Sequence, residues 1–196
     1  MNYWILLTFF FIHHAGFAQQ HWKLKKDAND IKIFTRATTD SNINEFKAET
    51  IILASLDDVL NELLSAPPYF DGCEAGISYY VESNGDDKHI FYAKKDLPWP
   101  LKDRDIVTQL TVKKINRSTV KLCLEGLPNE LPLQEKTIRI KKLMGHWLLE
   151  ADGNRTKVTQ QLFVDPEGSL PPLIINSLLI KGPYKTFSEL HKAVGE

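Results

Sequence analysis

The sequence predicts an α+β domain in which a run of antiparallel strands is followed by a C-terminal helix. Three pairs of strand-like segments are joined by short turn sequences, which is the pattern of β-hairpins. The last segment, residues 171–194, has helical spacing instead. Strands and helices do not alternate along the chain, and this disfavours a parallel βαβ architecture.

The hairpins are expected around three turns. Residues 77–82 and 88–95 flank Asn84-Gly85, residues 105–115 and 119–125 flank Asn116-Arg117, and residues 136–150 and 155–164 flank Asp152-Gly153-Asn154. Within 136–150 the apolar positions change parity, since Ile138 and Ile140 are even whereas Trp147 and Leu149 are odd. This change predicts a β-bulge near Lys141-Lys142 that bends the sheet.

The preceding part of the chain adds two strands and a helix, at residues 31–36, 46–53 and 56–64. Ser55 is a suitable N-cap for the helix, and Pro67-Pro68 is expected to stop it. Residues 22–29 form an amphipathic opening, for which one interpretation is a helical turn.

Composition limits the classes of function. The 196 residues suit one domain and carry a net charge of -1, so nucleic acid is not the expected partner. There is no CxxC or HExxH motif, and His21, His89, His146 and His191 are scattered. No metal site and no cofactor are therefore expected.

The N-terminus resembles an export signal. An uncharged apolar run of about ten residues, Tyr3–Ile12, precedes small residues at Gly16 and Ala18. We expect residues 1–18 to be a cleaved signal peptide and residues 19–196 to form a single exported domain, periplasmic or secreted; an uncleaved anchor is the alternative. Export would make Cys73 and Cys123 candidates for a disulfide, and the sequence leaves their pairing open.

The C-terminal helix points to a ligand. Residues 173–180 are apolar almost all the way round, whereas residues 184–194 return to amphipathic spacing. Gly182-Pro183 separates the two halves and is expected to kink or restart the helix. Two interpretations remain open: a lid over an apolar cavity, or a core helix packed on loops.

Several motifs resemble the START (StAR-related lipid-transfer) domain family. Residues 98–107 (PWPLKDRDIV) resemble its PWP-x-x-x-RD-x-V block, and residues 165–171 (DPEGSLP) resemble its DPGGSIP block. Residues 145–147 (GHW) resemble a Gly-x-Trp in a late strand of the family, and residues 31–36 (IKIFTR) resemble its opening strand. The resemblance covers the mature chain in the right order. The match departs from the family pattern at Glu167 and Leu173.

The resemblance implies a helix-grip fold, in which a curved antiparallel sheet wraps around a long C-terminal helix and encloses a hydrophobic cavity. It also implies that Arg104 offers a ligand a polar anchor. An ion pair between Arg104 and Asp103 or Asp105 is the structural alternative. Some family members place an acidic residue opposite this Arg, but neither Glu74 nor Glu82 clearly matches it. The ligand-binding residues expected from parity and resemblance are Arg104, Trp99, Tyr79, Phe91, Trp147, Leu173, Ile174 and Leu178.

A protein of this kind is expected to bind one lipid, sterol or similar hydrophobic small molecule and to carry or sense it. It is expected to be a monomer with transient membrane contact. No G-x-S-x-G, Ser/His/Asp set or Gly-rich phosphate loop is present, so an enzyme is not expected. The alternative is a helix-grip enzyme of the cyclase/aromatase or hydrolase type, in which His89, His146 or Arg104 would do acid–base or orienting work.

Overall fold

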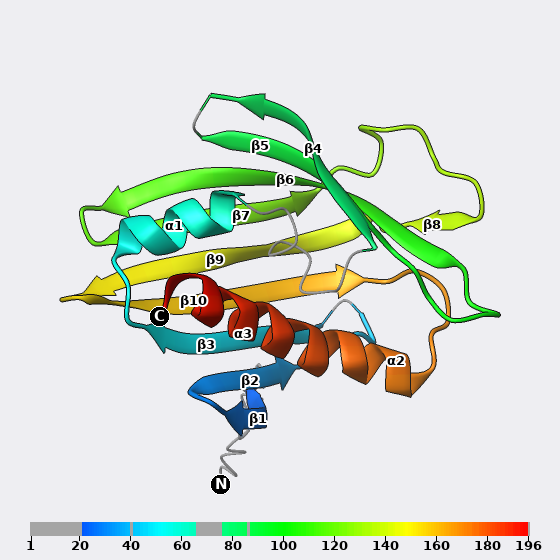
Figure 1. The fold of residues 1–196 in the computed structure, drawn as a ribbon. Helices are drawn as coiled ribbons and strands as arrows, with labels where there is room; N and C mark the ends of the chain where they lie inside the picture. Colours follow the sequence, from blue (N-terminus) through cyan, green and yellow to red (C-terminus); the bar gives the residue numbers. More distant parts are fainter. Residues whose placement is uncertain (1–20, 40, 66–75, 86, 196) are drawn as a thin grey trace, which may run out of the picture.

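The computed structural model describes residues 21–39, 41–65, 76–85 and 87–195. One curved sheet carries the helices on its concave face, with the C-terminal helix lying across it (Figure 1). The strands are β1 (Lys23–Ala28), β2 (Ile31–Arg36), β3 (Glu45–Ile52), β4 (Ile77–Asn84), β5 (Lys88–Lys95), β6 (Asp103–Asn116), β7 (Thr119–Gly126), β8 (Thr137–Arg139), β9 (Lys142–Asp152) and β10 (Arg155–Asp165). The helices are α1 (Leu56–Ser65), α2 (Pro172–Asn176), the π-helix η2 (Ser177–Lys181) and α3 (Gly182–Val194).

The sheet has ten strands, nine of them in the order β1-β2-β3-β10-β9-β7-β6-β5-β4. The three predicted hairpins are the pairs β4–β5, β6–β7 and β9–β10, all antiparallel. Gly85 and Gly153 have φ of 68° and 65°, which the turns at these positions require and which glycine adopts without strain. Strand β10 also pairs with β3, so the chain's last strand joins its first three to the rest of the sheet.

Two local expectations are wrong. Residues 22–29 do not contain a helical turn: β1 pairs with β2 through a turn in which Asn29 and Asp30 have positive φ. Residues 136–150 are not one bulged strand either. The first strand of this region, β8, ends at Arg139 and pairs in parallel with the start of β6. A separate strand, β9, begins at Lys142 and pairs with β7 and β10.

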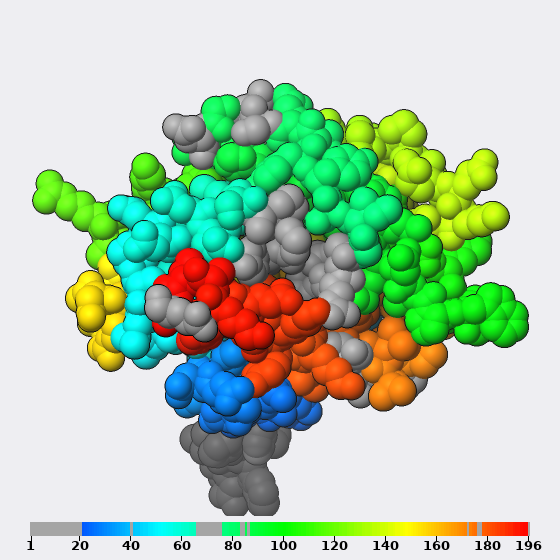
Figure 2. All heavy atoms as spheres, viewed as in Figure 1, coloured from blue at the N-terminus to red at the C-terminus, as the bar shows by residue number. Residues whose placement is uncertain are grey.

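Helix α1 follows the predicted amphipathic pattern. The Ser55 hydroxyl accepts a hydrogen bond from the Asp58 backbone N–H at 3.2 Å, which caps the first turn. Val59, Leu60 and Leu63 are buried against the sheet. Figure 2 shows α1 lying beside the C-terminal end of α3, and the two helices are in contact. The expected stop at Pro67-Pro68 lies outside the described residues.

The C-terminal helix runs from α2 through η2 into α3 without a loop. Pro183 has no backbone N–H, so the helix cannot make the usual bond from this position to the Leu179 carbonyl. The π turn of η2 ends at Lys181 and α3 begins at Gly182 with Pro183 in its first turn, so the α-helix restarts at the expected position. Among the described residues, no helix is long and apolar enough to cross a membrane.

The core lies between the concave face and the helices. Its centre is the stack of Trp147 on β9 against Phe187 on α3, with ring centroids 5.3 Å apart. Both side chains have no exposed surface. This contact fixes α3 on the sheet and leaves α2 and η2 over the part of the concave face that holds the cavity.

Candidate functional site

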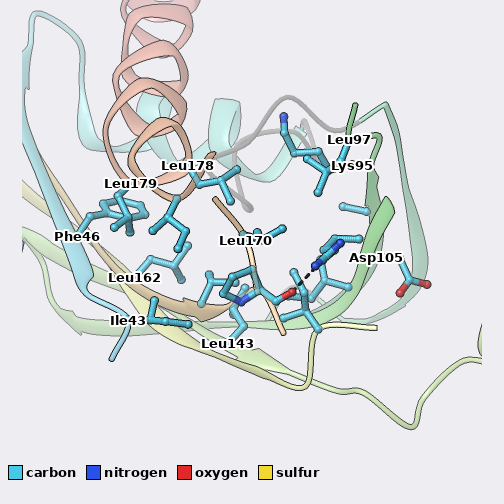
Figure 3. Close-up of a pocket in the computed structure, with 17 residues that line it drawn as sticks. Ile43, Phe46, Lys95, Leu97, Asp105, Leu143, Leu162, Leu170, Leu178 and Leu179 are labelled. Carbon is cyan, nitrogen blue, oxygen red and sulfur yellow. Dashed lines mark hydrogen bonds between the residues drawn. The ribbon is translucent and has the colours of Figure 1, made fainter. Parts of the chain in front are cut away.

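A cavity of about 80 Å³ lies between the concave face and the first half of the C-terminal helix (Figure 3). Its wall is almost wholly apolar. Phe46, Leu143 and Leu162 come from β3, β9 and β10, and Leu178 and Leu179 come from η2. These side chains meet because strands distant in the sequence are neighbours in the sheet, so that Phe46 pairs with Leu162.

Three charged residues also line the cavity: Lys95, Arg104 and Asp105. Figure 3 shows the carboxylate of Asp105 directed away from the cavity. The Asp105 side chain forms a bidentate pair with Arg139, with both N–O distances 2.9 Å. Arg139 also donates to the carbonyls of Pro128, Leu131 and Pro132. This buried pair ties β6 to β8 and to the loop before β8.

The guanidinium of Arg104 donates its hydrogen bonds to backbone carbonyls and not to a carboxylate. Its Nε donates to the Pro166 carbonyl at 2.9 Å and its Nη2 to the Glu167 carbonyl at 2.9 Å, and Nη1 donates to the Lys102 carbonyl. Burial lowers the pKa of its guanidinium, which nevertheless stays charged at neutral pH. The side chain therefore joins the start of β6 to the segment that leads into α2.

Asp103 and Asp105, the two carboxylates considered as partners of Arg104, form ion pairs with other residues. Asp103 lies 2.9 Å from Lys94 Nζ, and this pairing lowers the pKa of the Asp103 carboxyl. Asp105 is bound by Arg139. The glutamate considered at position 74 lies outside the described residues, and Glu82 is exposed on β4. Among the described ion pairs, none includes Arg104.

Of the residues predicted to bind ligand, Arg104 and Leu178 line the cavity. Ile174 is half-buried on α2, next to the cavity residue Ile175. Leu173 is 76% exposed, so it faces away from the sheet.

The remaining four predicted residues are not in the cavity wall. Phe91 and Trp147 are completely buried in the core, and Tyr79 is 47% exposed on β4. Trp99 is 93% exposed in the loop before β6. A Trp between two prolines gave no indication of the direction in which its ring points, and whether any of these residues contacts a ligand stays a prediction.

Other chemistry in the described part of the chain is sparse. No group of three or more His, Cys, Asp or Glu residues there could hold a metal ion. Cys123 on β7 is a free, half-buried thiol, and Cys73 lies outside the described residues. Burial lowers the pKa of both His146 and His191, so both rings are neutral at pH 7.

The chain is similar to known proteins in sequence and in structure. The model of the START domain family matches residues 10–196. An uncharacterized protein of Pseudomonas aeruginosa is 29% identical over 178 residues, covering 89% of this chain and 87% of that protein. The crystal structure of a STAR-related lipid transfer protein from Xanthomonas axonopodis has a TM-score of 0.77 at 30% identity, covering 87% of this chain and 97% of the other. Human StAR-related lipid transfer protein 5 has a TM-score of 0.74 at 17% identity, covering 88% and 86%, and so shares the fold.

Proposed function

We propose that this chain, which belongs to the START domain family, binds one hydrophobic small molecule in the cavity beneath α2 and η2. It carries or senses that molecule. The observation that carries the proposal is an apolar cavity roofed by an apolar helix. Transfer of apolar surface from water into such a cavity gains about 25 cal/mol per Å², which binds a lipid without covalent chemistry.

The ligand-bound form requires a larger cavity. Pockets that enclose drug-sized ligands have volumes of roughly 300–1,000 Å³, whereas this cavity has about 80 Å³. The half of the helix that roofs it packs less extensively on the rest of the fold than α3 does, because α3 contacts β2, β3 and α1, whereas the contacts of η2 are with β3. We propose that a ligand enters by displacing α2 and η2 while α3 stays on the sheet.

A hydrogen bond near the C-terminus supports a fixed α3. The Thr50 hydroxyl donates its single proton to the Asp30 carbonyl at 2.9 Å. The contact of 2.7 Å between Thr50 Oγ1 and His191 Nε2 therefore has His191 as the donor. This bond and the Trp147–Phe187 stack hold α3 at two points.

The test is native mass spectrometry of the purified protein, followed by extraction and identification of any co-purifying lipid. Leu178→Arg puts a charge in the cavity wall and is expected to abolish ligand retention. Leu173→Arg is the matched control, since Leu173 lies five residues away on the same helical run but is exposed. Equal ligand occupancy in the two variants, or a wild-type protein that takes up no lipid, would refute the proposal.

Carriage rather than catalysis is supported by the described cavity wall, in which there is no His, Cys or Ser and the carboxylate of Asp105 is bound by Arg139. Conversion of a bound lipid during incubation with purified protein, absent from Leu178→Arg, would favour the enzyme alternative. We also propose that the protein is a monomer and that the exposed Trp99, in the loop before β6, makes transient membrane contact.

Export after cleavage at Ala18 is a further part of the proposal, and it rests on the N-terminal sequence alone. Cell fractionation with N-terminal sequencing of the purified protein tests it. A mature N-terminus at Gln19 is expected, and an intact Met1 on cytoplasmic protein would refute it.

A further inference from the structure

Two buried polar side chains on the concave face lack hydrogen-bond partners among the described residues. Gln160 on β10 has no exposed surface, and neither Oε1 nor Nε2 of its amide is bonded. Trp147 on β9 is equally buried, and its indole Nε1–H is also without a partner. Buried polar groups are nearly always hydrogen-bonded, so two such groups together require an explanation.

The two side chains are neighbours. Gln160 pairs directly with Trp147 across the β9–β10 ladder, so both project from the same face of the sheet. This face is the concave one, because Trp147 stacks on Phe187 of α3. The next residue of β10 with the same orientation is Leu162, which lines the cavity.

The unbonded amide therefore lies just beyond the cavity wall formed by Leu162. Residues two apart on a strand are separated by about 7 Å. A change in the rotamer of Leu162 would therefore extend the cavity towards Gln160. From Gln160 to Pro166, which Arg104 holds, the chain covers roughly 20 Å, the length available to an elongated molecule.

The chemistry of the pair selects the ligand group. An amide offers two donors and an acceptor, and an indole offers one donor. A group that only accepts, such as an ester or a carboxylate, leaves Gln160 Oε1 without a donor. The partners of Gln160 on both flanking strands, Ala48 and Trp147, are uncharged, so neither supplies a counter-ion for a charged group.

We infer that Gln160 and Trp147 form a polar subsite that receives the neutral hydroxyl end of an otherwise apolar ligand. The ligand hydroxyl donates to Gln160 Oε1 and accepts from Trp147 Nε1–H or Gln160 Nε2–H. This inference rests on the proposed function and deepens it by naming the ligand class and the end of the ligand that lies deepest in the fold.

The test compares decanol, decane and decanoate as competitors of 1-anilinonaphthalene-8-sulfonate bound to the protein. In Gln160→Leu the ratio of the Kd for decane to the Kd for decanol is expected to fall roughly tenfold relative to wild type. Gln161→Leu is the matched control, because the adjacent amide bonds to Glu45 on the opposite face of the sheet. Its ratio should equal that of wild type.

A second measurement uses the wild-type protein and so does not depend on the folding of a variant. The indole ¹H–¹⁵N signal of Trp147, assigned through nuclear Overhauser contacts with the Phe187 ring, is expected to move downfield with decanol and not with decane. Equal Kd ratios in wild type and Gln160→Leu, or an indole signal that responds alike to both ligands, would overturn the subsite. Tighter, Gln160-dependent binding of decanoate would overturn the neutral hydroxyl. Failure of all three compounds to bind would instead count against the proposed function.

Discussion

Replacing Arg104 with Met tests whether this side chain fastens the C-terminal helical segment to the sheet. Arg104 is 7% exposed and donates to three backbone carbonyls, two of them on the segment that leads into α2. A hydrogen bond from a charged donor contributes about 1.5–3 kcal/mol. The Lys102 carbonyl belongs to an exposed residue and is hydrated when its bond is lost, so the bonds to Pro166 and Glu167 carry the effect.

We expect Arg104→Met to lower the free energy of unfolding by about 3 kcal/mol, since Pro166 is buried and Glu167 is half-buried. Urea unfolding measures this loss, and hydrogen exchange should speed up first in residues 170–181. Arg155→Met is the control, because its ion pair with Asp152 is exposed and contributes less than about 1 kcal/mol.

Ligand binding separates this role from that of an anchor. A clamp predicts that Arg104→Met still takes up lipid but releases it faster, because the roof of the cavity opens more often. A variant as stable as wild type that no longer binds lipid would refute the reasoning and would make Arg104 the polar anchor implied by the family resemblance.

Three further outcomes follow from the same geometry. Asp105→Ala leaves Arg139 charged and buried, so urea unfolding should show a loss of about 3–5 kcal/mol, and a loss below 1 kcal/mol would contradict a buried pair. Burial, followed by the charge and hydrogen bond of Asp105, raises the pKa of Tyr92 to about 12. The protonated phenol therefore stabilises the fold fully below pH 10, and about 3 kcal/mol of this is lost as the pH rises from 10 to 12, a loss that should be absent from Tyr92→Phe in pH-dependent unfolding. Gly145→Ala would place a Cβ atom 2.2 Å from the Gln161 carbonyl oxygen, so thermal unfolding should show a destabilisation of about 3 kcal/mol, and an unchanged Tm would contradict the close approach.

Much of the fold could be predicted because its signals are local. The turn residues at Gly85 and Gly153 and the alternation around them define hairpins without knowledge of the rest of the chain. The separate strand β8 depends instead on a contact between Arg139 and Asp105, 34 residues apart, and no local pattern reports such a pairing. The amphipathic opening was ambiguous for a different reason, since a six-residue strand at a sheet edge is too short to separate helical from strand periodicity.

The candidate site was less predictable, because its walls come from strands whose pairing is not local. Leu178 followed from the apolar helix, whereas Phe46 and Leu143 became cavity residues only through the order β3-β10-β9. Gln160 was missed although a signal existed. It has the parity of Val158 and Leu162, so a polar residue occupied an inward position of β10. The polar stretch Thr159-Gln160-Gln161 concealed this parity.

The C-terminal helix is held at its two ends by different means, and this difference supports the proposed displacement of α2 and η2. Arg104 binds the backbone just before α2, and the Trp147–Phe187 stack and the His191–Thr50 bond hold α3. The η2 turn lies between these attachments, where Pro183 has already removed a backbone hydrogen bond. If α2 and η2 are displaced as proposed, we expect the helix to deform at this turn while both attachments hold, so that the cavity enlarges without unfolding of the domain.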